Sequence, residues 1–108
     1  MCELNQKVIY QKHYLLPDDM DLFQYFKSGD VDSRLFQDKG IIYIVMLNGE
    51  IFEYNCVASL IFEGIKMHKS KEEIIDNIAE IFSVEKSQVE QDYIFFVKDM
   101  LSNQILVE

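Results

Sequence analysis

The stretch Ile41-Ile-Tyr-Ile-Val-Met-Leu-Asn48-Gly49-Glu50-Ile-Phe-Glu-Tyr54 decides the fold of this 108-residue chain. Two β-branched and aromatic runs flank Asn48-Gly49, and a type I′ turn needs positive φ at both central residues, which Asn and Gly adopt most easily. The stretch therefore predicts a β-hairpin. A short run at residues 34–37, separated from the hairpin by a glycine-containing turn at residues 38–40, predicts a third strand and a three-stranded meander.

After the hairpin the apolar period changes from two residues to about 3.6, which indicates helices. Asn55 is a good N-cap for the first helix. Ser70 and Glu73 form a capping-box pattern that starts the second. The expected elements are helices over residues 55–67, 70–83 and 86–103, and a short terminal strand over residues 105–107.

Strands precede helices, an order typical of an α+β domain with its helices packed on one face or end of an antiparallel sheet. Two short helices and a longer one beside a hairpin predict a winged helix-turn-helix-like fold, with a three-stranded antiparallel sheet followed by three helices. This domain is expected over residues 34–108. Residues 1–33 are expected to be an N-terminal extension of uncertain structure, with residues 7–16 extended and residues 21–26 forming one or two helical turns.

Charge narrows the class of partner. The chain has 10 basic and 19 acidic residues and a formal net charge of −9. From Ser70 to the end, three lysines stand against nine acids, a net charge of 3 − 9 = −6. A winged helix that reads DNA carries basic groups on its third helix, because phosphates are bound mainly by Lys and Arg. We therefore expect no nucleic-acid partner.

The sequence also predicts the cellular compartment of the protein. Cys2 and Cys56 show no motif spacing and are interpreted as ordinary reduced cysteines, which are typical of the cytoplasm. The longest apolar runs, such as residues 41–47, are too short to cross a bilayer, and the N-terminal residues lack the pattern of a signal peptide. We expect a cytoplasmic protein without a membrane segment.

No pattern in the sequence indicates catalysis. His13 and His68 are far apart and lack neighbouring ligands, whereas a metal site needs three or four converging donors. Cys56 follows the N-cap Asn55, a place where a thiol can become a nucleophile, but no partner base is suggested and a packed thiol is the better interpretation. There is no phosphate loop and no nucleophile elbow. We expect a protein without enzymatic activity, metal or cofactor.

The last predicted helix has more apolar surface than a single core contact needs. One stripe is predicted to face the core and consists of Val89, Tyr93, Phe96 and Met100. A second stripe, roughly 90° around the helix, consists of Ile94, Val97 and Leu101. Either the core contact is wider and includes the N-terminal segment, or the second stripe lines a groove for a partner. The sequence leaves both alternatives open.

From the hairpin onward, the order of motifs resembles the PqqD-like family, whose fold is also called the recognition element of ribosomally synthesised, modified peptides. The segment Gly49-x4-Tyr54-Asn55-x2-Ala58-x2-Ile61-Phe62-x-Gly64 is similar to the family's Gly-x-x-x-Leu-Asn-x-x-Ala-x-x-Ile-Leu. Glu72-Glu73-Ile74, Val89-x-x-Asp92-Tyr93-x-x-Phe96-Val97 and Ile105-Leu106 match its later motifs. The resemblance covers about residues 34–107, and Tyr54 stands where the family usually has leucine.

The resemblance implies a non-catalytic peptide-binding module. In the family, the leader of a precursor peptide adds as a strand to the sheet edge, rests against the third helix and is presented to a modifying enzyme. That enzyme is often a radical S-adenosylmethionine enzyme, or a leader protease in lasso-peptide systems. Strand addition needs an open edge and a neighbouring apolar groove. The candidate peptide-binding residues are Glu50, Ile51, Phe52, Glu53, Tyr54, Ile94, Val97, Lys98 and Leu101.

Alternation along the edge strand places Phe52 and Tyr54 on one face and Ile51 and Glu53 on the other. Tyr54 is assigned to the core by its match to the family's leucine, and Phe52 goes with it, so Ile51 is the better candidate for contact with a peptide. The alternative function is an acidic winged-helix adaptor or regulator that binds a folded protein partner. Whether the protein forms a homodimer through residues 1–33 is left open.

Overall fold

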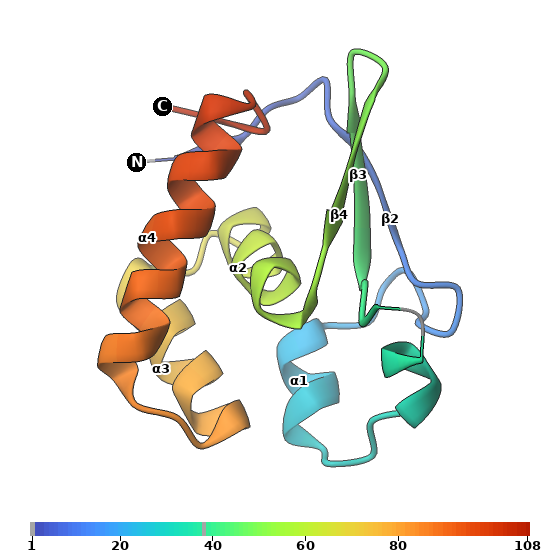
Figure 1. Cartoon of the computed structure of the whole chain (residues 1–108), viewed down its shortest axis with the longest axis vertical. Helices are drawn as coiled ribbons and strands as arrows, with labels where there is room; N and C mark the ends of the chain where they lie inside the picture. Colours follow the sequence, from blue (N-terminus) through green and yellow to red (C-terminus); the bar gives the residue numbers. More distant parts are fainter. Residues whose placement is uncertain (1, 38) are drawn as a thin grey trace.

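The computed structural model describes residues 2–37 and 39–108, and it places an antiparallel sheet beside a group of helices (Figure 1). The sheet strands, in pairing order, are β2 (Ile9–Lys12), β3 (Tyr43–Leu47) and β4 (Glu50–Tyr54). The α-helices are α1 (Leu22–Lys27), α2 (Cys56–Lys66), α3 (Lys71–Phe82) and α4 (Lys86–Ser102). A 3-10 helix, η1, spans Ser33–Phe36, and a small ribbon pairs β1 (Glu3–Leu4) with β5 (Leu106–Val107). The predicted class, an antiparallel three-stranded sheet followed by three helices, is confirmed.

The hairpin forms as predicted. Asn48 and Gly49 have φ values of 51° and 83°, so both central residues of the turn lie in the left-handed region that a type I′ turn requires. Leu47 pairs with Glu50, and the register continues along the whole of β4. The turn expected at residues 38–40 includes Asp38, which lies outside the described residues.

The third strand of the sheet is not the predicted one. Residues 34–36 belong to the 3-10 helix, because Asp32 accepts a hydrogen bond from the N–H of Arg34 at 3.0 Å and pairs with its guanidinium at 2.6 Å. The third strand is instead β2, which pairs antiparallel with β3. The strand predicted at residues 34–37 is therefore wrong. A run of four residues contains too little alternation to distinguish a strand from a capped turn.

The three predicted helices form, with their predicted caps in place. The side chain of Asn55 accepts a hydrogen bond from the N–H of Ala58 at 3.0 Å, and that of Ser70 accepts one from the N–H of Glu73 at 3.1 Å. Ser83 ends α3 in the left-handed conformation. The predicted terminal strand is β5, which pairs antiparallel with β1.

The N-terminal segment is part of the packed structure. It supplies β1, β2 and α1, and α1 lies where helical turns were predicted, with Asp21 as its N-cap. Leu22, Phe23 and Phe26 of α1 are buried in the core. The segment that the sequence marks as an extension therefore completes the main sheet and covers part of the helical core.

The core lies between the sheet and the helices, and α2 is at its centre (Figure 1). Gly64 of α2 marks a close approach, because a Cβ atom there would lie 2.5 Å from Cγ1 of Ile74 and 3.3 Å from Cζ of Phe23. Both neighbours are almost completely buried. Within the described ranges, no helix has the length and apolar character needed to cross a membrane.

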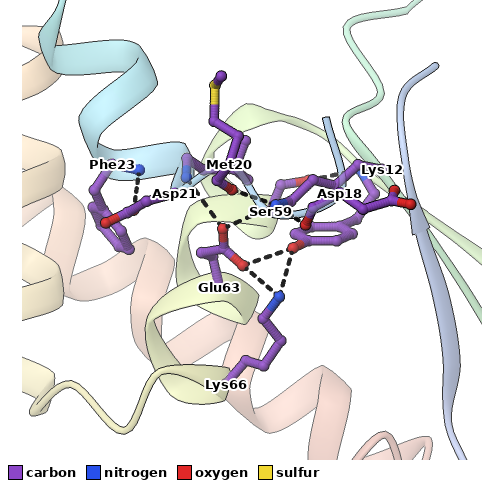
Figure 2. Close-up of polar contacts among 10 residues, drawn as sticks. Lys12, Asp18, Met20, Asp21, Phe23, Ser59, Glu63 and Lys66 are labelled. Atoms are coloured by element: carbon purple, nitrogen blue, oxygen red, sulfur yellow. Dashed lines mark hydrogen bonds and ion pairs between the residues drawn. The ribbon is translucent and has the colours of Figure 1, made fainter. Parts of the chain in front are cut away.

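A buried carboxylate joins the N-terminal segment to the helices (Figure 2). Glu63 of α2 is 1% exposed and accepts hydrogen bonds from the Tyr43 hydroxyl at 2.6 Å and from the Leu22 N–H at 3.1 Å. It also pairs with Nζ of Lys66 at 2.9 Å and with Nζ of Lys12 at 3.6 Å. One side chain thus connects α1, α2, β2 and β3.

Lys12 on β2 is buried as well, and its ammonium group has partners besides Glu63. Nζ donates a hydrogen bond to the backbone carbonyl of Asp18 at 3.0 Å and another to that of Met20. A charged group can be buried only where paired charges and hydrogen bonds replace its hydration. The loop between β2 and α1 is therefore held by the same cluster.

The surroundings of Glu63 also set its pKa. Burial alone raises the pKa, but the hydrogen bonds from Tyr43, Lys66 and Leu22 outweigh it, so the pKa of Glu63 lies below its ordinary value of 4.5. A lowered folded-state pKa means that the unfolded chain binds more protons. The ionised carboxylate therefore stabilises the fold above its ordinary pKa, and this contribution declines below that value and is lost as the pH falls through the lower folded-state pKa.

We predict that Gly64→Ala lowers the free energy of unfolding by about 1–3 kcal/mol, because the added methyl group overpacks the contact with Ile74. Urea unfolding measures the change. Gln91→Ala on the exposed side of α4 is the control and should shift stability by less than about 0.5 kcal/mol. A stabilised Gly64→Ala variant, as helix propensity alone would give, contradicts the close packing.

We predict that Glu63→Gln costs about 3–5 kcal/mol near neutral pH, because Lys12 is left buried without a counter-charge. The difference from the unsubstituted protein should shrink as the pH falls below about 4.5, where Glu63 becomes protonated on unfolding. Urea unfolding at several pH values checks both statements. Glu53→Gln, an exposed carboxylate on β4, should have little effect. A pH-independent difference would show that Glu63 does not titrate as described.

Candidate functional site

The strand β4 is an open edge of the sheet. It pairs with β3 on one side, and no other described strand pairs with it on the other. Asn55 caps α2 directly after β4, so the chain leaves the sheet at this point. The free N–H and C=O groups of an edge strand are a template for another extended chain.

A hollow lies beside this edge. It has a volume of about 250 Å³, and its lining comes from the β3–β4 turn, from Glu50 and Phe52 of β4, and from residues 102–104 at the end of α4. In Figure 1, α4 lies on one side of α2 and the sheet on the other. We call the space between β4 and α4, at this hollow, the β4–α4 groove.

One side of α4 faces the groove. Asn103 lines the hollow, and the charge of Asp99 acts on Tyr54 of β4. Phe96 is three residues before Asp99 and seven before Asn103, so helical spacing places it on the same side. Phe95 packs its ring edge-on against Phe96 at 5.3 Å between centroids and is 66% exposed. Phe95 therefore provides exposed apolar surface on this side of α4, next to Phe96, which is partly buried against the core.

The side chains of β4 alternate between the core face and the outer face of the sheet, as predicted. Tyr54 is buried, which confirms its core assignment, and Phe52 is partly buried against the core. Ile51 and Glu53 lie on the outer face of the sheet, where Ile51 is 66% exposed and pairs with Met46. Ile51 is accessible, as expected of a contact residue, but it does not face α4.

The second stripe of α4 does not face β4. Leu101 lines a different hollow with Asn5 and residues of the β1–β5 ribbon. Val97 and Leu101 are partly buried against the core, Ile94 is 54% exposed and Lys98 is exposed. Of the two alternatives left open by the sequence, the structure favours the wider core contact, and it does not bring this stripe together with β4.

A larger hollow of about 670 Å³ lies at the other edge of the sheet and includes Lys12 and Lys66 in its lining. Both lysines are paired with Glu63, so their ammonium groups stabilise the fold (Figure 2). Burial raises the pKa of the Cys56 thiol, which suits a packed residue rather than a nucleophile. Among the described residues, no three His, Cys, Asp or Glu side chains are grouped to hold a metal ion.

The fold and the groove define a small winged helix-turn-helix-like protein with an uncovered strand edge beside its last helix. The family model for coenzyme PQQ synthesis protein D (PqqD) matches residues 34–106. The match covers more than half of the chain, and the chain belongs to the PqqD family. The family resemblance drawn from the motifs is confirmed. No curated protein matches the sequence.

The fold is also similar to that of TbiB1, whose structure was solved in complex with the TbiA(beta) leader peptide. The two structures align with a TM-score of 0.64, over 96% of this chain and 93% of the TbiB1 chain, at 20% sequence identity. At this identity the similarity is one of fold. Because it covers 96% of the chain, it includes elements that precede residue 34.

The orientation of α4 leads to a stability prediction. Leu101→Glu should lower the free energy of unfolding by about 1–3 kcal/mol, because it places a charge against the core and the β1–β5 ribbon. Phe95→Glu, on the exposed side, should change stability by less than about 0.5 kcal/mol. Thermal or urea unfolding of the two variants measures the difference. Equal stability of the two would show that α4 is rotated from the orientation described.

Proposed function

We propose that this protein is a non-catalytic recognition protein that binds the leader of a ribosomally synthesised precursor peptide and presents it to a modifying enzyme. The observation that carries the proposal is the open edge of β4 beside the β4–α4 groove in a member of the PqqD family. The fold similarity to TbiB1, a protein solved with a leader peptide, supports it. The family supports this function over the alternative of an acidic adaptor for a folded partner.

The leader would add as a fourth strand beside β4. Its main chain would pair with the free groups of β4, and alternate side chains would point into the groove or onto the outer face. Side chains pointing inward would meet Phe52 on β4 and Phe96 and Phe95 on α4. Side chains pointing outward would lie next to Ile51 and Glu53.

The proposed binding residues therefore differ in part from those expected from the sequence. Residues 50–54 keep their role because they form the edge strand. Phe95 and Phe96 take the place of the second stripe, because helical spacing puts them on the side of Asp99 and Asn103, whereas Leu101 lines the hollow beside β5. The modifying enzyme is expected to be a radical S-adenosylmethionine enzyme or a lasso-type leader protease, in the cytoplasm, as the family resemblance implies.

We predict that peptides selected for binding from a random display library bind as an extended strand on β4. In ¹⁵N-labelled protein, amide shifts and exchange protection should appear on residues 50–54 and on the groove side of α4, because these groups become paired or covered. The strand β2 is the other edge of the same sheet and serves as an internal control. Perturbations confined to residues 9–12 would overturn the proposed site.

Strand addition also predicts that only every second N–H group of the bound peptide pairs with β4. N-methylation of a selected peptide at every second residue should abolish binding in one register, because those N–H groups pair with β4. The same modification in the other register should be tolerated. Equal sensitivity at all positions would indicate a helical or irregular binding mode and would contradict the proposal.

A further inference from the structure

The hydroxyl group of Tyr54 on the edge strand β4 is a buried polar atom that the fold does not explain. Tyr54 is 5% exposed, and its hydroxyl has no hydrogen-bond partner within residues 2–37 and 39–108. The hydroxyl of Tyr43, opposite it on β3, donates to Glu63 and accepts from Lys66. Buried polar atoms are normally satisfied, and one that is not needs an explanation. The usual leucine of the family would fill this position without such an atom.

The position of this hydroxyl relates it to the groove. Tyr54 is on the same face of β4 as Phe52, which lines the hollow, and as Glu50. Burial first, and then the negative charge of Asp99 on α4, raise the pKa of Tyr54. The hydroxyl therefore lies in the field of an acidic side chain on the opposite wall of the groove.

The groove walls are acidic and hold unpaired carboxylates. Glu50 lines the hollow, Asp99 is exposed, and neither forms an ion pair in the part of the chain that the structure describes. The other polar groups at the hollow are uncharged and come from Asn48 in the β3–β4 turn and from residues 102–104 at the end of α4. Lys7 lines a separate hollow on the outer side of the turn, which Glu50 also reaches. A cation entering the groove would meet acceptors and no lysine or arginine among the residues that line the hollow.

We propose that the groove recognises a leader segment with the pattern basic, any, apolar, any, basic. This inference rests on the proposed function and names the peptide class that the same site would bind. In an added strand, residues two apart share a face, so three inward side chains would lie opposite Glu50, Phe52 and Tyr54. The basic residue beside Tyr54 donates hydrogen bonds to the tyrosine oxygen and to the Asp99 carboxylate. The pattern reads the same in both strand directions.

The test starts from peptides selected on the full chain from a random display library, aligned on their β4-bound segment. We expect Lys or Arg at the two outer positions and an apolar residue between them. If peptides bind at β4 but the outer positions are neutral or acidic, this inference fails and the proposed function stands. If no peptide binds at β4, the proposed function itself fails.

Matched variants test whether Tyr54 and Asp99 bind the basic residue of the peptide. Tyr54→Phe removes only the hydroxyl and Asp99→Asn only the charge, and each should weaken a selected Lys-containing peptide by about tenfold, as charge-assisted hydrogen bonds would require. The same peptide with Gln in place of that Lys should bind all three proteins equally. Glu80→Gln, an exposed acid on α3, is the charge control and should bind like the unsubstituted protein. The inference would be overturned if Glu80→Gln no longer bound the Lys peptide more tightly than the Gln peptide. It would also be overturned if both Tyr54→Phe and Asp99→Asn still preferred the Lys peptide as the unsubstituted protein does.

Discussion

The rest of the structure depends on the hydrogen bonds and ion pairs of one buried carboxylate, that of Glu63. It accepts hydrogen bonds from β3 and from the start of α1, and it pairs with one lysine of α2 and one of β2 (Figure 2). A buried charge is costly unless each of its oxygens has partners, so the elements that supply these partners must come together. This requirement places the N-terminal strand on the sheet, although that strand is short and is distant in sequence from the hairpin.

That placement also decides which edge is free. With Lys12 of β2 held at Glu63, β2 occupies one side of β3, and β4 is left as the edge that borders α4. The hollow next to β2 includes the paired lysines Lys12 and Lys66 in its lining, whereas the hollow next to β4 is lined by Leu47, Phe52, the carboxylate of Glu50 and uncharged polar residues. The two edges of one small sheet thus have different chemistry.

Candidate site residues could be predicted from the sequence where their role requires only that they belong to one particular strand. The edge strand at residues 50–54 follows from the Asn48-Gly49 turn and from Asn55, which ends the strand by capping a helix. The groove side of α4 was not predictable, because two apolar stripes on one helix are equivalent until the positions of α2 and of the β1–β5 ribbon are known. Phe96 was expected in the core and Leu101 in a groove, and both are partly buried against the core.

The sequence by itself determined the hairpin, the three helices with their caps, the acidic character and the family, because each depends on neighbouring residues, on composition or on motif order. Only the tertiary structure decided the origin of the third strand and the partners of Glu63. It also decided which face of α4 borders β4. These features depend on contacts between residues far apart in the chain, such as Lys12 with Glu63, and local periodicity carries no information about which distant groups will satisfy a buried charge.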